Sequence, residues 1–383
     1  PDGGHFELDP HYHLACINIF CKALRMADIN GFRNEFPQSY IDTIENMIVF
    51  YMNVCYPDYS NPCFSDAKKG NPKDEQQNYR EWHLLFPDNQ QILYFATNGQ
   101  SGKAPGNLSK GHLKTGFFTF RNGWQQDATV MVMKAGPKGE WHCQPDNGTF
   151  ELWFNGKNLF PDSGSYVYAG GNEVMKLRNW FRQTAVHNTL TLDNKNLETT
   201  ESVTRLWKPE GKVQIAVTEN PGYKNLKHRR SIFFVDRKYF VIVDEAIGSA
   251  TGNINLHYQL CDGKVEIDTE HLSVTTDFEG YSQVKLQCFA DKGTSLKEEE
   301  GWYSTAYRQR TKRTALSFNT EKKEKETVRF ITVIYPVKEK KDFPDITASF
   351  NSINQEQNTM EIEVTVNGKK QSLKYQLQPG NIN

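Results

Sequence analysis

The chain lacks a long apolar run and has almost no net charge. No stretch reaches the roughly 18 uninterrupted apolar residues that a membrane span requires, and the N-terminus lacks the charged-then-apolar order of a signal peptide. The formal net charge is only -1, which argues against a nucleic-acid binder driven by bulk positive charge. We therefore expect neither a membrane span nor a nucleic-acid partner.

The chain also lacks paired cysteines and an initiating methionine. Its seven cysteines are an odd number without a CxxC pair, so they indicate neither a disulfide framework nor a zinc ribbon. The sequence opens on Pro1-Asp2-Gly3-Gly4 and runs almost at once into an amphipathic pattern. It reads like a segment that starts in the middle of a protein.

What is present is typical of a folded, globular protein. The 383 residues include 13% aromatic and 24% charged side chains, a balance that makes disorder unlikely to dominate and allows a large core. A chain of this length exceeds the usual single domain, so we expect two structural units.

The first unit is predicted to be helical. Apolar residues recur at three- and four-residue intervals over residues 14–26 and 41–56, which is the period of a helix. Residues 61–78 are rich in Asn, Pro, Lys and Gly and indicate a loop. Residues 90–97 can form another short helix.

The second unit is predicted to be made of strands. After about Leu113, short β-prone runs alternate with turn residues; they lie at 117–120, 129–133, 150–154, 189–192, 213–217, 231–235, 239–243, 328–334 and 360–366. Asp236-Arg237-Lys238 and Asn367-Gly368 are the expected hairpin tips. So many closely spaced strands predict an antiparallel β-sandwich, and the whole chain an α+β multidomain fold.

Three clusters contain residues suited to chemistry, and the first surrounds a helix start. Asp9 as N-cap with Pro10 in the first turn would place Tyr12 and His13 at the helix opening. The positive end of a helix dipole favours an anion there. The alternative is that Tyr12 is a half-buried packing aromatic and the histidines are surface residues.

The other two clusters lie in the β region. His142 precedes the turn Asp146-Asn147-Gly148, where a functional loop and a structural turn are equally good interpretations. Arg182 could pair with a carboxylate or sulfate, and His187 could be a ligand or a core imidazole. Gln144, Asp162 and His187 could supply two oxygens and a nitrogen to a divalent cation, although their spacing matches no recognised metal motif.

Four motifs in order give these clusters a context. They are Asp-Gly-x-x-x-Glu followed by Tyr-His, a His before Phe-Glu-Leu-Trp, Pro-Asp-x-Gly-x-Tyr, and Phe-Arg-x-Thr-Ala-x-His-Asn-Thr. Together they resemble the heparinase II/III family of polysaccharide lyases over residues 2–193. The resemblance implies the end of an incomplete (α/α) toroid at residues 1–112, a large antiparallel β-sandwich domain at 113–383, and an active site between them. It also implies an upstream helical segment of the same protein.

The resemblance assigns roles to individual residues. Tyr12 matches the catalytic tyrosine and His142 the catalytic histidine. Gln144 stands where many relatives have a metal-binding histidine, and Asp162 and His187 match the remaining ligands. We therefore expect no organic cofactor and at most one structural divalent cation, calcium or zinc; Gln144 in place of histidine puts zinc in doubt and makes calcium possible. The family's carboxylate-neutralising Asn or His has no counterpart in this chain.

The implied function is cleavage of heparan sulfate or heparin-like acidic polysaccharide, of low sulfation, by β-elimination. Tyr12 would protonate the leaving oxygen once burial and positive neighbours lower its pKa, and it could also be the base for one uronate epimer, with His142 the base for the other. Arg182, Trp180 and His187 are the expected substrate contacts, with Trp180 as core the alternative. The family implies a periplasmic or secreted location.

Three other functions stay open at this point. A relative acting on alginate shares most of these motifs. A glycoside hydrolase would need two carboxylates about 5–9 Å apart, which Glu7, Asp9, Asp146 and Asp162 could provide. A carbohydrate-binding β-sandwich with a helical cap would bind without turnover.

Overall fold

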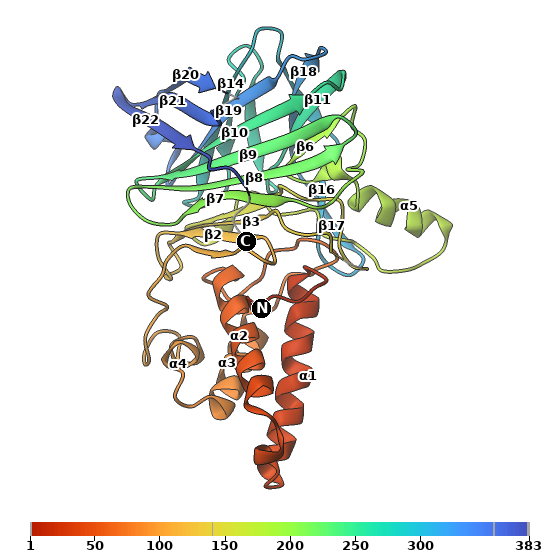
Figure 1. Cartoon of the computed structure of the whole chain (residues 1–383), viewed down its shortest axis with the longest axis vertical. Coiled ribbons are helices and arrows are strands. Elements are labelled where there is room, and N and C mark those ends of the chain that lie inside the picture. The colour runs from red at the N-terminus through yellow and green to blue at the C-terminus, as the bar shows by residue number, and fades with distance from the viewer. Residues whose placement is uncertain (1, 140, 355–356, 381–383) are drawn as a thin grey trace.

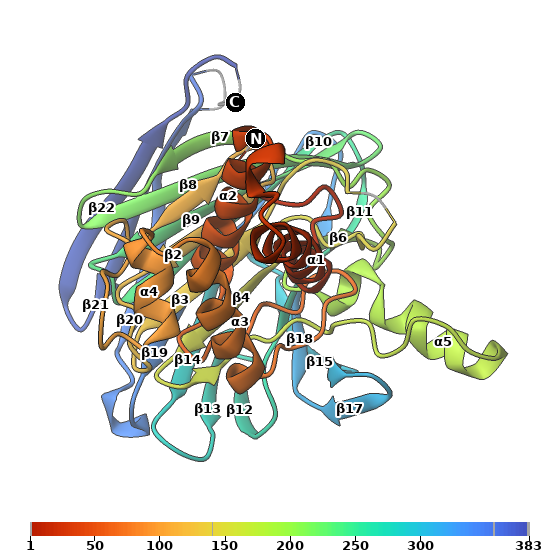
Figure 2. The same ribbon diagram turned by 90° about the horizontal axis from the view of Figure 1, so that it is seen from below.

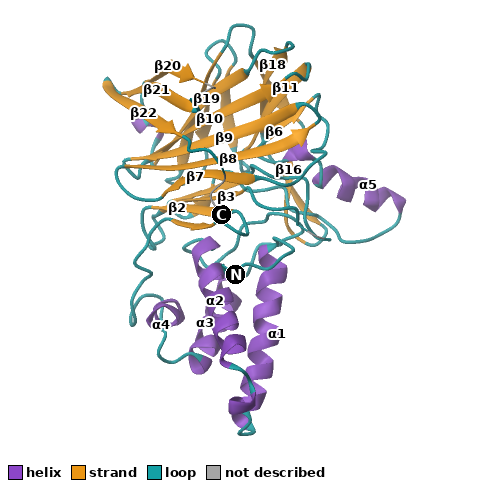
Figure 3. Ribbon diagram, in the orientation of Figure 1, coloured by secondary structure: helices purple, strands orange, loops and turns teal. Residues whose placement is uncertain are grey.

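The computed structural model describes residues 2–139, 141–354 and 357–380. Four helices come first and stacked antiparallel sheets follow (Figure 1), so strands far outnumber helices (Figure 3). The helices of the first part are α1 (Pro10–Ile29), α2 (Gln38–Val54), α3 (Pro72–Leu85) and α4 (Gln90–Ala96). None of the helices in the described ranges is long and apolar enough to cross a membrane.

The predicted helices at 14–26, 41–56 and 90–97 are confirmed, but the loop predicted for 61–78 is wrong beyond its first half. Asn71 caps α3 by accepting a hydrogen bond from the Lys73 amide at 3.0 Å, and Pro72 occupies the first turn. The apolar face of α3 is narrow, with Tyr79, Trp82 and Leu85 buried. The other residues of α3 are mostly polar, so the composition of this segment did not indicate a helix.

The strands form five antiparallel sheets. A five-stranded sheet holds, in spatial order, β1 (Lys110–His112), β2 (Phe117–Arg121), β3 (Thr129–Lys134), β4 (Phe150–Phe154) and β5 (Lys157–Asn158). An eight-stranded sheet holds β12 (Lys264–Asp268), β13 (Ser273–Asp277), β14 (Gln283–Ala290), β19 (Val328–Val337), β10 (Tyr239–Gly248), β9 (Leu226–Val235), β8 (Val213–Tyr223) and β7 (Val203–Lys208).

Three smaller sheets complete the β region. They consist of β15 (Ser295–Glu299), β18 (Ala315–Lys322), β11 (Gly252–Gln259) and β6 (Leu190–Leu192); of β16 (Trp302–Ala306) and β17 (Gln309–Lys312); and of β20 (Ile346–Asn354), β21 (Thr359–Val366) and β22 (Lys369–Gln376). Every run predicted as a strand is confirmed as part of one of these elements.

The sheets are layered because side chains alternate along the central strands. Phe234 and Phe240 face a core shared with the five- and four-stranded sheets, whereas Phe233 and Val241 face the three-stranded sheet on the other side. The eight-stranded sheet is therefore the middle layer, and its central strands β9 and β10 are buried on both faces.

Both predicted hairpin tips are confirmed. β9 pairs with β10 around Asp236 and Arg237, and β21 pairs with β22 around Asn367 and Gly368. All four residues have positive φ, as a tight turn between right-twisted strands requires.

A fifth helix, α5 (Asn172–Phe181), interrupts the β region and was not predicted. It projects from the sheets in Figures 1 and 2, and only Arg178 and Phe181 of its residues are buried. Val174, Leu177 and Phe181 recur at intervals of three and four residues, a short helical period that the sequence analysis missed. The turn after it returns the chain to the sheets.

The helices lie over the five-stranded sheet (Figure 2), and a small apolar core fills the junction. Phe50 of α2 contacts Phe117 of β2 with ring centroids 5.4 Å apart. Buried Arg121 of β2 donates to the carbonyl oxygen of Cys55, just beyond α2, at 2.7 Å. Because β1 pairs with β2, the sheet begins slightly before the boundary predicted between residues 112 and 113.

Candidate active site

Tyr12 and His142 meet at the junction of helices and sheets. Tyr12 lies in the first turn of α1, where the Asp9 carboxylate accepts hydrogen bonds from the amides of His11 at 2.8 Å and Tyr12 at 3.0 Å. His142 lies in the connection between β3 and β4. Their rings stack with centroids 3.8 Å apart and planes 14° from parallel, so the fold brings together the two residues predicted as a proton-transfer pair.

The electrostatic surroundings of Tyr12 differ from the expectation. Burial, followed by the Asp9 and Asp66 carboxylates, raises the pKa of Tyr12 above its ordinary value. The predicted lowering by positive neighbours is therefore wrong for the described residues. A raised pKa keeps the phenol neutral at working pH, which suits a proton donor better than a base.

A buried carboxylate, Asp66, lies behind His142 and was missed by the sequence analysis. Its Oδ2 is 3.1 Å from His142 Nδ1 and accepts a hydrogen bond from Arg178 Nη2 at 2.7 Å. Its Oδ1 accepts from Gln144 Nε2 at 3.2 Å and from Arg182 Nη1 at 3.3 Å. No local pattern predicts this, because the partners are 76 to 116 residues away in sequence.

The three residues predicted to contact substrate differ in how deeply they are buried. Arg182 is half-buried, and besides Asp66 it donates to the Cys143 carbonyl oxygen at 3.0 Å. Trp180 is half-buried against Phe181, with ring centroids 4.9 Å apart. His187 is fully buried, which separates it from any surface that a polysaccharide reaches.

An exposed aromatic residue beside the pair was also missed. Tyr168 is 60% exposed, its ring centroid is 5.6 Å from that of His142, and the Arg178 guanidinium lies 5.3 Å from its ring. It follows Tyr166 of the Pro-Asp-x-Gly-x-Tyr motif by two residues, which is the only sequence signal that pointed to this place.

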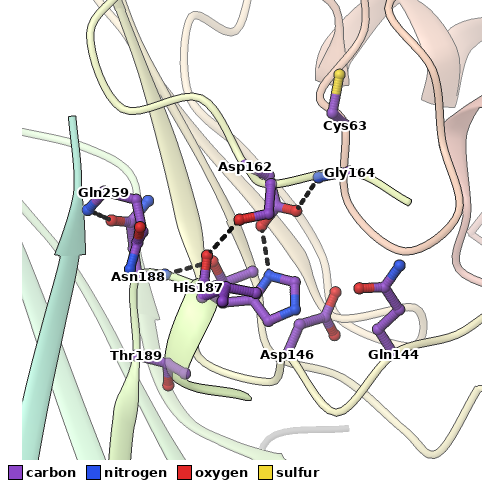
Figure 4. A network of polar contacts seen from close by, with 12 residues as sticks. Cys63, Gln144, Asp146, Asp162, Gly164, His187, Asn188, Thr189 and Gln259 are labelled. Atoms are coloured by element: carbon purple, nitrogen blue, oxygen red, sulfur yellow. Dashed lines mark hydrogen bonds and ion pairs between the residues drawn. The ribbon is translucent and has the colours of Figure 1, made fainter. Parts of the chain in front are cut away.

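The predicted cation ligands come together in a buried polar site (Figure 4). Asp162 Oδ2 is 2.8 Å from His187 Nδ1, and both side chains are fully buried. Gln144 donates through Nε2 to the Ser65 carbonyl oxygen at 2.5 Å. Gln144 Oε1 and His187 Nε2 are buried and have no hydrogen-bond partner.

These two unpartnered atoms test whether a cation fits. Buried polar atoms without partners are rare and call for an explanation such as an ion, and an amide oxygen and an imidazole nitrogen are both possible ligands of a divalent cation. Among the residues that the structure describes, no three His, Cys, Asp or Glu side chains form a metal group; here the third ligand would be the glutamine. Asp162 holds His187 through Nδ1, which leaves Nε2 for the cation.

A buried lysine ties together the loops that form the site. Lys134 of β3 has no exposed side-chain surface, and its Nζ donates to both oxygens of Asp146 at 2.8 and 2.9 Å and to Ser65 Oγ at 2.6 Å. Burial acts to lower the pKa of Lys134, but Asp146 and Cys143 outweigh it and raise the pKa above its ordinary value. The lysine stays charged and fixes the loop of Asp66 to that of His142.

These observations describe a helical part and a layered β part, with Tyr12 and His142 stacked at their junction. The model of "Heparinase II/III N-terminus" matches residues 1–94 and that of "Heparinase II/III-like, C-terminal" matches residues 104–365. The chain therefore belongs to the heparinase II/III family.

Similar proteins agree with this assignment. A heparin-sulfate lyase of Bacteroides stercoris is 65% identical over 98% of this chain, and one of Pedobacter heparinus is 44% identical over 97%. The chain spans 56% of the length of each. Among solved structures, a heparinase III superposes with a TM-score of 0.97 at 65% identity, covering 98% of this chain and 59% of that one. The heparan sulfate lyase HepC of Pedobacter heparinus gives 0.94 at 42%, covering 99% and 60%.

Proposed function

We propose that the protein containing this chain is a polysaccharide lyase that cleaves heparan sulfate of low sulfation by β-elimination and releases 4,5-unsaturated uronate products. The observation that carries the proposal is the stacked pair of Tyr12 and His142, 3.8 Å apart at the junction of helices and sheets. Relatives at 65% and 44% identity that are named heparin-sulfate lyases supply the substrate class.

The reaction removes the C5 proton of a hexuronate and expels the C4 glycosidic oxygen. Tyr12, kept neutral by its raised pKa, is suited to protonate the leaving oxygen, and His142 is suited to remove the C5 proton of one uronate epimer. Arg178 and Arg182, which donate to the Asp66 carboxylate, are the groups we propose to stabilise the charge that develops on the uronate carboxylate. The residue that neutralises this carboxylate directly would lie upstream.

The contacts of the acidic residues disfavour a glycoside hydrolase. Asp146 is paired with Lys134 at 2.8 Å and Asp162 with His187 at 2.8 Å. Asp9 caps α1, and Glu7 lies 3.8 Å from His5. No two of the four candidate carboxylates are left facing one substrate bond as acid and nucleophile. An alginate lyase of the same family is the nearer rival.

For substrate binding, we propose Trp180 and Arg182 as contacts, with Tyr168 beside them. An aromatic face stacks against a pyranose ring, and Tyr168 is exposed next to His142. Arg182 shares its guanidinium between Asp66 and Cys143, so we expect it to contact a sulfate or carboxylate with only part of its donor set.

We further propose one structural divalent cation, calcium in preference to zinc, held by Gln144 Oε1 and His187 Nε2 with Asp162 in support. The unpartnered buried oxygen and nitrogen support this proposal. The cation would neutralise buried polar groups and fix the loops around His142, and none of the proton transfers above passes through it.

The remaining proposals concern the whole protein. We propose that α1–α4 are the end of an incomplete (α/α) toroid, that the layered sheets are the family's β-sandwich domain, and that an upstream helical segment packs on α1. Exposed apolar side chains on and after α1 support this, namely Ile19, Met26, Ile29 and Phe32. A periplasmic or secreted location is proposed from the family alone.

The experiment that tests the function follows the ultraviolet absorbance of the new C4=C5 double bond on heparan sulfate and on alginate. It uses the protein with its upstream segment and its Tyr12→Phe variant. We expect a signal on heparan sulfate that falls at least about 100-fold in the variant. A signal on alginate alone favours the rival lyase; chain shortening without absorbance establishes a hydrolase; binding without either establishes a binding protein.

A further inference from the structure

Asp66 lies outside the four sequence motifs, yet its carboxylate contacts several residues around His142. It is 4% exposed. His142 Nδ1 and Arg178 contact its Oδ2, Gln144 contacts its Oδ1, and Arg182 Nη1 donates to both oxygens. Arg178 and Gln144 are buried as well. The carboxylate therefore has one orientation, set by groups from two other parts of the chain: the connection that carries His142 and Gln144, and the end of α5.

This orientation determines which nitrogen of His142 carries hydrogen. An ionised carboxylate only accepts hydrogen bonds, so the hydrogen in the 3.1 Å contact belongs to His142 Nδ1. A neutral imidazole with hydrogen on Nδ1 has its lone pair on Nε2. The stack on Tyr12 fixes the plane of the same ring.

We propose that Asp66 is a positioning residue, which holds His142 as the Nδ1–H tautomer so that Nε2 is the basic nitrogen offered to the sugar. Arg178 and Arg182, at the end of α5, hold Asp66 in turn. This inference rests on the proposed lyase function and deepens it by assigning a role to a residue outside the four motifs.

A purely structural role for Asp66 makes different predictions. In that case its ion pairs only fasten the loop after α2 to α5, and their loss would reduce stability and leave the His142 tautomer unchanged. In a positioning role the tautomer changes, because replacing the carboxylate leaves more hydrogen-bond donors than acceptors. His142 Nδ1 can switch from donor to acceptor, whereas the Gln144 amide is held as a donor by the Ser65 carbonyl oxygen, which accepts from its Nε2 at 2.5 Å.

The first measurement is long-range ¹H–¹⁵N nuclear magnetic resonance of histidine in the protein and its Asp66→Asn variant, at a pH where imidazole is neutral. His142→Ala identifies the signals of His142. We expect the Nδ1–H tautomer in the unaltered protein and the Nε2–H tautomer in Asp66→Asn. Should Asp66→Asn not fold, Asp66→Ala offers the same comparison. The same tautomer in the protein and the variant would overturn the inference.

The second measurement is kinetic. Residues that orient a functional histidine typically contribute about 10- to 100-fold to activity, so we expect kcat of Asp66→Asn to fall at least about 10-fold while KM changes less than about threefold. The loss should fall on the uronate epimer, glucuronate or iduronate, on which His142→Ala also loses activity. Asp58→Asn is the matched control, because that carboxylate pairs with Lys69 at 3.6 Å, and we expect it to behave as the unaltered protein.

The two proposals fail separately. If Tyr12→Phe keeps the ultraviolet signal, the proposed lyase mechanism is wrong, whereas the tautomer of His142 is still measured without any turnover. If Tyr12→Phe loses the signal while Asp66→Asn keeps both kcat and the Nδ1–H tautomer, the lyase assignment holds and the role of Asp66 is refuted.

Discussion

At the scale of single residues, the site depends on charges that are buried in matched sets. Lys134 with Asp146, and Asp66 with Arg178, lose nearly all contact with water. Removing one partner of such a pair leaves an uncompensated charge in a medium of low polarity, which costs more than the pair itself contributes. Replacing one residue of such a pair should therefore reduce the free energy of unfolding by more than the loss of its hydrogen bonds alone.

Lys134→Met tests this point, since methionine has a similar shape and no charge. We expect the free energy of unfolding to fall by about 3–5 kcal/mol, because Asp146 is left buried and unpaired. Urea denaturation measures the change. Lys176→Met is the control: Lys176 and its partner Glu173 are mostly exposed, so we expect an effect within about 0.5 kcal/mol. A loss below about 1 kcal/mol for Lys134→Met would contradict the argument.

At the scale of elements, α1 was predictable, and the carboxylate that caps it is buried at a cost to its charged form. Asp9, Pro10 and the apolar period are local signals, and each lies where the sequence placed it. Burial raises the pKa of Asp9 to about 7, against an ordinary value of 3.8. One oxygen of this carboxylate, Oδ2, is buried without a partner.

The raised pKa of Asp9 gives a pH-dependent prediction for the stability of Asp9→Asn. A raised pKa means that the folded protein holds the proton more tightly than the unfolded chain, so the contribution of Asp9 is complete below about pH 4 and is lost as pH rises through about 7. Asparagine keeps the capping oxygen and does not ionise. We expect the variant to gain stability relative to the original protein by roughly 2–4 kcal/mol between pH 4 and pH 8.

Denaturation at several pH values measures that gain. The exposed carboxylate of Asp42 in α2 provides the control, and Asp42→Asn should show no pH-dependent difference. A constant offset for Asp9→Asn across the whole range would show that Asp9 ionises normally in the folded protein.

The two helices that escaped prediction give short local signals. α3 has only a narrow apolar face, and the helical period of α5 is limited to Val174, Leu177 and Phe181. Strands and hairpin tips were predictable because alternation and left-handed turn residues are local. Asp66 was not predictable, since its function lies in partners that only the finished fold brings near.

At the scale of the whole molecule, a cation would join the loops that carry His142 and His187. Adding calcium to protein dialysed against a chelator should raise the melting temperature by a few degrees, because a ligand at 100 times its Kd contributes about 2.7 kcal/mol. Gln144→Ala should abolish the rise. Glu279→Gln, an exposed carboxylate elsewhere, should keep it. An equal rise in Gln144→Ala would place the ion at another site.

The placement of Tyr12, Asp66 and His142 in distant segments has a consequence for folding. Their side chains meet only after the helical part has docked on the five-stranded sheet, and closing such long loops is slow because the entropy must be lost before the contacts form. Helices and hairpins form from neighbours in sequence and need no such closure. During refolding, the return of the Tyr12–His142 stack therefore marks the docking of the two parts, and secondary structure alone does not report it.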